Sequence, residues 1–110
     1  MNNNFSYTGK VTGISGEKAG MSFLIANTGT MIGRDPTVCH IIMRKSAGVS
    51  RIHCFITYNN ANGTYVISDR NSTYGTFTES GQKIMPGNSI ALKHGERFYL
   101  GSPQNMFEVG

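Results

Sequence analysis

The sequence predicts an all-β domain, folded as a sandwich of two twisted sheets. About ten short runs of β-branched, aromatic and other apolar residues follow one another, each bounded by Gly, Asn or Pro. No window of useful length has the apolar periodicity of an amphipathic helix. The chain contains 14 glycines and 15% charged residues, a composition that suits many short strands joined by tight turns.

The predicted strands account for most of the chain after residue 21. The clearest signal is a hairpin, in which the runs Ile52–Tyr58 and Thr64–Asp69 flank an Asn-Gly turn at residues 59–63. A basic loop is expected from Arg44 to Val49. The remaining predicted strands are Ser22–Ala26, Thr30–Ile32, His40–Met43, Thr76–Thr78, Lys83–Ile84, Ser89–Leu92, Arg97–Leu100 and Met106–Val109.

Length and charge limit the possible classes of protein. The 110 residues suffice for one hydrophobic core, so we expect one domain over residues 1–110, alone or within a longer protein. No apolar run approaches the length of a membrane span. Met1–Phe5 lacks the basic and apolar parts of a signal peptide, which favours a cytoplasmic location. The net charge of +4 favours an anionic partner, although the scattered basic residues argue against nucleic acid.

The two cysteines, Cys39 and Cys54, exclude a disulfide-rich scaffold and leave one possible disulfide. Because His40 and His53 are their direct neighbours, a metal site is an alternative. However, adjacent ligands lack the Cys-x-x-Cys spacing of zinc sites, and adjacent strand residues point to opposite faces. We therefore expect neither metal nor cofactor, and interpret both cysteines as small buried core residues.

Three short motifs carry the functional signal. They are Gly33-Arg34, Ser50-Arg51-Ile52-His53 and Ser72-Thr73-Tyr74-Gly75, in this order along the chain. Each joins a strand-like run to a turn, and together they offer guanidinium groups, hydroxyls and glycines. An arginine fork donates paired hydrogen bonds to phosphate, and successive N–H groups in a tight turn form an anion-binding concavity. The motifs therefore indicate a phosphate site built from loops.

This order and spacing resemble the forkhead-associated (FHA) family of phosphothreonine-binding domains, whose pattern is Gly-Arg, Ser-x-x-His and Ser-x-Asn-Gly. The segment Leu92–Gly101 is similar to the family's closing Leu-x-x-Gly-Asp and apolar strand, so the resemblance covers nearly the whole chain. It implies an FHA-type β-sandwich with its binding loops at one end. One position departs from the pattern, because Tyr74 stands where the family has Asn.

The resemblance also implies roles for individual residues. Four are implied to bind the phosphate: Arg34, Ser50, Arg51 and Thr73, the last through its hydroxyl and its backbone N–H. Three are implied to contact the surrounding peptide: Lys45, Asn71 and Tyr74. Three are implied to support the loops: Gly33, Gly75 and His53, of which the histidine would be buried and hydrogen bonded.

We predict a non-catalytic module that recognises phosphothreonine in proteins of serine/threonine-kinase signalling. An enzyme is not expected, because no nucleophile or carboxylate is spaced to work with His53. A phospho-independent interaction or self-assembly module on the same fold is the alternative, with its peptide register altered by Tyr74. For Arg34, the alternative to phosphate binding is a structural ion pair with Asp35 or Asp69.

Overall fold

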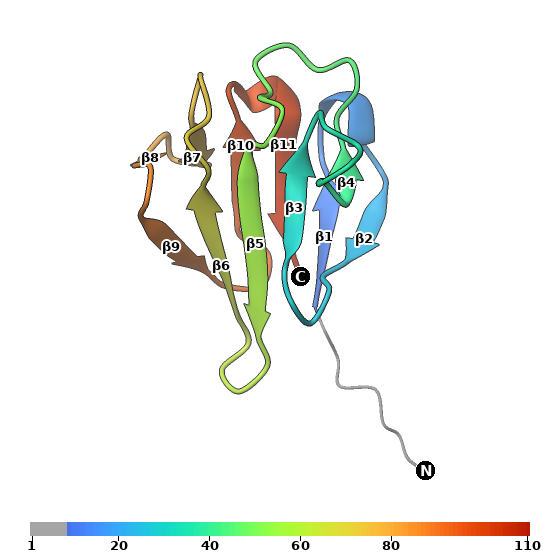
Figure 1. Cartoon of the computed structure of the whole chain (residues 1–110). Coiled ribbons are helices and arrows are strands. Elements are labelled where there is room, and N and C mark those ends of the chain that lie inside the picture. The colour runs from blue at the N-terminus through green and yellow to red at the C-terminus, as the bar shows by residue number, and fades with distance from the viewer. Residues whose placement is uncertain (1–8) are drawn as a thin grey trace.

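Within residues 9–110, which the structure describes, eleven strands form two sheets packed as a sandwich in the computed structural model (Figure 1). Met1–Phe5, considered above for a signal peptide, lies outside the described residues. The strands are β1 (Lys10–Gly13), β2 (Ser22–Leu24), β3 (Thr30–Gly33), β4 (Ile41–Ile42), β5 (Cys54–Asn59), β6 (Thr64–Asp69), β7 (Thr76–Thr78), β8 (Lys83–Ile84), β9 (Ser89–Leu92), β10 (Arg97–Leu100) and β11 (Met106–Val109). One sheet has the order β2-β1-β11-β10-β7-β8 and the other β4-β3-β5-β6-β9.

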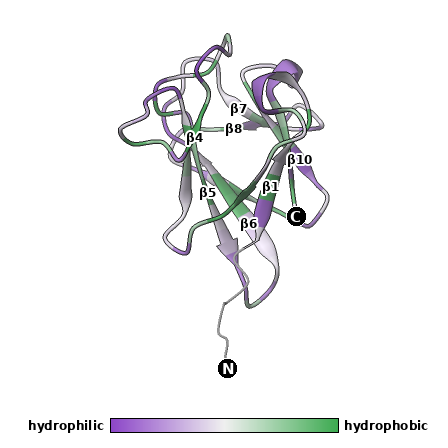
Figure 2. Cartoon of the chain, turned by 90° about the vertical axis from the view of Figure 1, so that its right-hand side faces the viewer, coloured by the Kyte–Doolittle hydropathy of each residue, from purple (hydrophilic) through white to green (hydrophobic). Residues whose placement is uncertain are grey.

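The core lies between the two sheets, which Figure 2 shows from the side. Burial alternates along the strands, so that Tyr65 and Ile67 of β6 face inward, as do Phe98 and Leu100 of β10. The rings of Phe98 and Phe107 are fully buried and stacked with centroids 5.6 Å apart. This alternation follows from the two-residue repeat of a strand, which puts every second side chain on the buried face.

The all-β sandwich predicted from the sequence is confirmed, and each predicted strand overlaps a strand of the structure. The hairpin is also confirmed, because β5 and β6 pair antiparallel over their whole lengths. Its turn is closed by the N–H of Gly63, which donates to the carbonyl of Asn59 at 2.8 Å. Strand ends differ from the prediction: the run His40–Met43 shortens to the two residues of β4.

The sequence does not predict β1, and here the structure adds a strand. Its four residues contain a single large apolar side chain, that of Val11, so no alternating pattern marks the segment. The strand forms because it pairs antiparallel with both β2 and β11, which buries Val11 completely. Local pattern carries little of this information, since strand preference depends strongly on the neighbouring strands.

Helical structure is minor in the part of the chain that the structure describes. Two three-residue 3₁₀ helices occur there, η1 (Gly16–Lys18) and η2 (Pro103–Asn105). Neither these nor any other described segment forms a helix long and apolar enough to cross a membrane.

Both cysteines are buried and free, which confirms their interpretation as core residues. Burial raises the pKa of the Cys39 thiol, whose Sγ donates to the carbonyl of Arg51. Burial likewise raises the pKa of Cys54. Among residues 9–110, no group of three or more His, Cys, Asp or Glu side chains is placed to hold a metal ion.

The topology gathers the three motifs at one end of the sandwich. The first motif closes β3, the second precedes β5, and the third connects β6 to β7. In Figure 1 these connections lie at the top, opposite the β5–β6 hairpin turn. Because strands of a common scaffold hold the loop ends, the second motif contacts both others: the Ser50 carbonyl accepts the Arg34 N–H, and His53 Nε2 donates to the Gly75 carbonyl.

Replacing the buried Phe98 by Ala tests the packing of the core. We expect the free energy of unfolding, measured by urea denaturation, to fall by about 3–5 kcal/mol, because the deletion leaves a cavity against Phe107. Leu24→Ala is the control, since that side chain is 74% exposed and should change stability by less than about 0.5 kcal/mol. Equal losses in the two variants would show that the stacked pair does not form the core.

Candidate functional site

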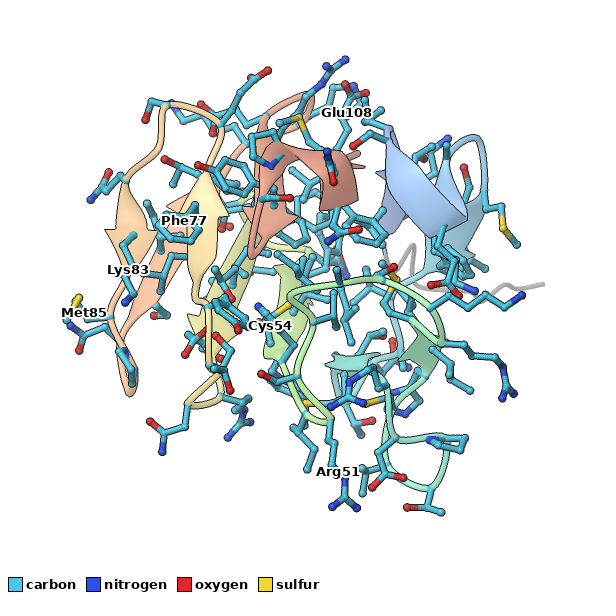
Figure 3. The ribbon with its side chains drawn as sticks, turned by 90° about the horizontal axis from the view of Figure 1, so that it is seen from above. Arg51, Cys54, Phe77, Lys83, Met85 and Glu108 are labelled. Carbon is cyan, nitrogen blue, oxygen red and sulfur yellow. The ribbon has the colours of Figure 1, made fainter. Side chains whose placement is uncertain are left out.

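A groove of about 930 Å³ opens at the end of the sandwich where the three motifs meet. All seven residues predicted to bind phosphate or peptide line it: Arg34, Lys45, Ser50, Arg51, Asn71, Thr73 and Tyr74. The three residues predicted to support the loops are buried: Gly33, His53 and Gly75. Figure 3 looks onto this end and shows Arg51 extending away from the body of the domain, with Cys54 in the interior.

The fully buried imidazole of His53 joins two of the motifs. Its Nδ1 accepts the backbone N–H of Ser50 at 3.0 Å, so the proton resides on Nε2, which donates to the carbonyl of Gly75 at 2.9 Å. Burial lowers the pKa of His53, and this outweighs the opposing effects of the Gly75 carbonyl and the Asp69 charge. The ring is therefore neutral and structural, with neither nitrogen available for proton transfer.

Sequence reasoning did not assign a supporting role to Asp69, although the structure gives it one. Its buried carboxylate accepts the N–H and hydroxyl of Ser72 and the hydroxyl of Thr76. The Ser72 hydroxyl in turn accepts the N–H of Gly75 at 3.0 Å. A signal was present in the sequence, because an acidic residue at a strand end followed three positions later by Ser is typical of a side-chain-stabilised turn.

Arg34 is exposed at the rim of the groove and fixed at one point. Its Nε donates to the carbonyl of Val49 at 2.7 Å, and its backbone N–H donates to the carbonyl of Ser50. Among the ion pairs of the described residues, none joins Arg34 to Asp35 or Asp69. This hydrogen bond of Nε fixes the orientation of the guanidinium. Its two terminal nitrogens suit a two-point contact with an oxyanion.

Ser50 and Thr73 are brought together from loops 23 residues apart. The Ser50 Oγ accepts the backbone N–H of Thr73 at 2.9 Å. This contact differs from the expectation that the Thr73 N–H faces a phosphate directly, because the Ser50 hydroxyl already occupies that donor. Ser50 and the exposed Thr73 both line the groove.

The Arg51 side chain is held less firmly than that of Arg34. Its guanidinium lies 3.5 Å from the Asp35 carboxylate, and 76% of its side chain is exposed. Hydrogen bonds from the hydroxyl and N–H of Thr37, and to a lesser degree the charge of Arg51, lower the pKa of Asp35. An exposed pair of this kind is weak, so Arg51 can exchange Asp35 for an anionic ligand at little cost.

Tyr74 and Asn71 form the wall contributed by the β6–β7 loop. The Tyr74 side chain is 64% exposed at the position where the FHA pattern has Asn. Asn71 has a φ of 62°, a left-handed conformation that Asn tolerates better than most residues. An exposed phenol places its hydroxyl farther from the backbone than an amide does, so the wall differs in reach as well as in chemistry.

Gly33 is required by close packing beneath the groove. Its φ is ordinary, but a Cβ at this position would collide with the backbone carbonyl of Arg51 and crowd the Cys39 sulfur. The close approach allows the N–H groups of Arg34 and Asp35 to reach the carbonyls of Ser50 and Arg51. A side chain here would separate the first motif from the second.

Comparison with known proteins gives one consistent result. The family model of the FHA domain matches residues 30–101. The FHA domain of CT664 from Chlamydia trachomatis is 23% identical with a TM-score of 0.78, the match covering 93% of this chain and 95% of that one. The FHA domain of an Arabidopsis thaliana hypothetical protein is 22% identical with a TM-score of 0.81, at 100% and 91% coverage.

A third similar structure is Mycobacterium tuberculosis EmbR in complex with a low-affinity phosphopeptide. It is 24% identical with a TM-score of 0.72, and the match covers 93% of this chain and 24% of EmbR. No curated protein sequence matches the chain significantly. At these identities the structural neighbours show that the fold is shared.

Lowering the pH tests the neutral, buried state of His53. Its pKa in the folded domain is below the ordinary value of 6.5, so as pH falls past 6.5 the unfolded chain binds a proton that the folded domain does not. We expect the free energy of unfolding to decrease between pH 7.5 and 5.5, in urea titrations, and His53→Gln to reduce this decrease. His94→Gln, at an exposed position, serves as control. An unchanged slope in His53→Gln would contradict the assignment.

Proposed function

The chain belongs to the FHA domain family, and we propose on this basis that its groove binds phosphothreonine in segments of partner proteins. FHA domains are interaction modules rather than enzymes, and the buried, fully hydrogen-bonded His53 agrees with a role in recognition. Phosphopeptide binding is described for EmbR, which shares this fold. The cytoplasmic location and the link to serine/threonine-kinase signalling expected from the sequence belong to the same proposal.

The observation that carries the proposal is the convergence of Arg34, Ser50 and Thr73 on one rim of the groove. The Ser50 carbonyl accepts the Arg34 N–H at 3.1 Å, and its hydroxyl accepts the Thr73 N–H at 2.9 Å. Three groups that suit a phosphate, a guanidinium and two hydroxyls, are therefore tied together through Ser50. Such preorganisation reduces the entropy lost on binding.

Magnitudes support discrimination between phosphorylated and unmodified peptide. A phosphate brings about −1.5 to −2 charges and three acceptor oxygens. Each charge-assisted hydrogen bond contributes about 1.5–3 kcal/mol, so two or three of them separate the two peptides by several factors of ten. Preference for threonine over serine requires a small site for the γ-methyl group, worth about 0.8 kcal/mol or roughly fourfold in affinity.

Arg34→Ala is the direct test of the proposal. We expect binding of a degenerate phosphothreonine peptide pool, followed by fluorescence polarisation, to weaken by at least about 100-fold, because the phosphate loses its two-point contact. Arg34→Lys should recover part of the affinity, since it keeps the charge without the fork. Arg70→Ala is the matched control, because Arg70 stacks on Phe55 outside the groove. Equal binding by wild type and Arg34→Ala, with both folded, would refute phosphate recognition.

Tyr74→Asn tests how the departure from the FHA pattern affects peptide binding. The family Asn is expected to bond the peptide main chain, so restoring it should strengthen binding of the phosphothreonine pool by about two- to tenfold, the value of one hydrogen bond. Tyr74→Phe should bind within about twofold of wild type if the phenol hydroxyl makes no such bond. Weaker binding by Tyr74→Asn would show instead that the Tyr74 ring contacts the peptide. Binding that ignores phosphorylation in all variants would favour the phospho-independent module.

A further inference from the structure

The basic loop at residues 44–49 is held at residues 44–46 by a carboxylate on η1. The Glu17 Oε2 accepts the backbone N–H of Arg44 at 2.8 Å, and Oε1 accepts the N–H of Lys45 at 2.9 Å and the hydroxyl of Ser46 at 2.8 Å. Burial opposes ionisation of Glu17, but these hydrogen bonds and the Lys18 charge prevail and lower the pKa of its carboxyl. Glu17 is therefore an ionised clamp on the loop backbone.

Two further contacts fix the loop toward its C-terminal end. The Asn105 side-chain amide donates to the carbonyls of Ala47 and Leu100, each at 3.1 Å. The Arg34 Nε donates to the carbonyl of Val49. The loop is thus anchored at its beginning, middle and end by side chains that come from η1, η2 and the end of β3.

Glu17 does not neutralise the cationic side chains of Arg44 and Lys45. Its carboxylate accepts hydrogen bonds from two main-chain N–H groups and one hydroxyl rather than from the ammonium or guanidinium groups. Within residues 9–110, Arg44 and Lys45 form no ion pair, and both side chains are exposed. Both also line the same groove as Arg34. They present positive charge to whatever lies along the groove beyond the phosphate.

The charges that line the groove exceed what one phosphate needs. Four cations, Arg34, Arg44, Lys45 and Arg51, face a single lining carboxylate, Asp35. Arg34 and Arg51, with Ser50 and Thr73, are the groups expected to bind one phosphate, which leaves Arg44 and Lys45. An extended peptide advances about 3.3–3.6 Å per residue, so residues next to the phosphothreonine lie within reach of other side chains that line the groove. A second anionic group on the peptide would meet the unpaired loop cations.

We propose that the Glu17-clamped loop is a second anion-binding element, and that the groove selects phosphothreonine peptides with a further acidic group close to the phosphothreonine. Carboxylates of Asp or Glu and a second phosphorylated residue share the chemistry required. The inference rests on the proposed phosphothreonine function and names the class of peptide within it. Arg44 and Lys45 determine specificity, and Glu17 is the positioning residue that holds their backbone.

Fluorescence polarisation with a matched set of peptides tests the proposal. The reference peptide carries phosphothreonine among neutral residues. Three relatives add two Asp residues before the phosphothreonine, two Asp residues after it, or a phosphoserine beside it, and a fourth carries the Asp residues with unmodified threonine. We expect at least one acidic phosphopeptide to bind about five- to tenfold more tightly than the reference at low salt, with the gain shrinking as salt rises.

Charge-matched variants separate the loop from the net charge of the protein. Arg44→Gln with Lys45→Gln should abolish the gain, so that this variant binds the acidic phosphopeptides no more tightly than it binds the reference peptide. The control is Lys10→Gln with Lys93→Gln, which removes the same charge at exposed positions. Lys10 begins β1 and Lys93 follows β9, and both strand ends lie at the end of the sandwich away from the groove (Figure 1). This control should keep the gain.

Glu17→Gln distinguishes positioning from simple attraction. Removing its negative charge makes the region more positive, so unaided attraction would increase the preference for acidic peptides. Replacing one acceptor oxygen by an NH₂ group also weakens the clamp, so positioning predicts that the preference falls by at least about half in this variant. A thermal melt confirms that the variant is folded.

The outcomes bear on the two proposals separately. Arg34-dependent binding of the reference peptide with no gain from any acidic relative would overturn the second anion-binding element and leave the proposed function intact. Loss of the gain in the Lys10 and Lys93 control, or an increased preference in Glu17→Gln, would also overturn it. Equal binding of acidic peptides with modified and unmodified threonine would show a general polyanion surface and refute both. The inference is supported if the gain in affinity for acidic phosphopeptides is lost in the Arg44 and Lys45 variant and kept in the Lys10 and Lys93 control.

Discussion

Two hydrogen bonds to the buried imidazole of His53 hold together the end of the sandwich on which the groove is built. One ring nitrogen fixes the backbone before β5 and the other fixes the turn before β7, 22 residues away. A buried ring that lost either partner would keep an unsatisfied polar atom away from water, so both loops must be in place at once. The groove consequently forms as a unit with the core, and its walls depend on one neutral side chain.

Two acidic residues also stabilise the loops around the groove. Asp69 accepts hydrogen bonds from Ser72 and Thr76, and Glu17 accepts them from the loop at residues 44–46. Neither carboxylate pairs with an arginine or lysine of the groove among the described residues. Because these carboxylates accept hydrogen bonds from main-chain and hydroxyl donors, they fix the shape of the loops. The cations at the rim of the groove stay available to an anionic ligand. Asp35 differs, because it forms an ion pair with the exposed side chain of Arg51.

Much of the fold was predictable because strand signals are local. The β-branched and aromatic runs of β5 and β6 and the Asn-Gly turn between them appear directly in the sequence. The strand β1 was not predictable, because its pairing with β2 and β11 rather than its residues makes it a strand. For the site, the motif residues were identified from their types and spacing. The supporting role of Asp69 was missed although the Ser three positions later is a local signal for it. Glu17 was not identified, since its backbone donors lie 27 and 28 residues away and leave no local motif.

The sequence by itself determined an all-β sandwich and the kinds of groups available to bind an anion, because side-chain chemistry and strand periodicity are properties of short segments. The tertiary structure alone decided which of these groups face one another. It turned the Thr73 N–H toward Ser50 and anchored Arg34 on Val49. Over residues 9–110 it also left the Arg44 and Lys45 side chains without an ion pair. These outcomes depend on contacts between loops 15 to 29 residues apart, and such contacts exist only once the two sheets have packed.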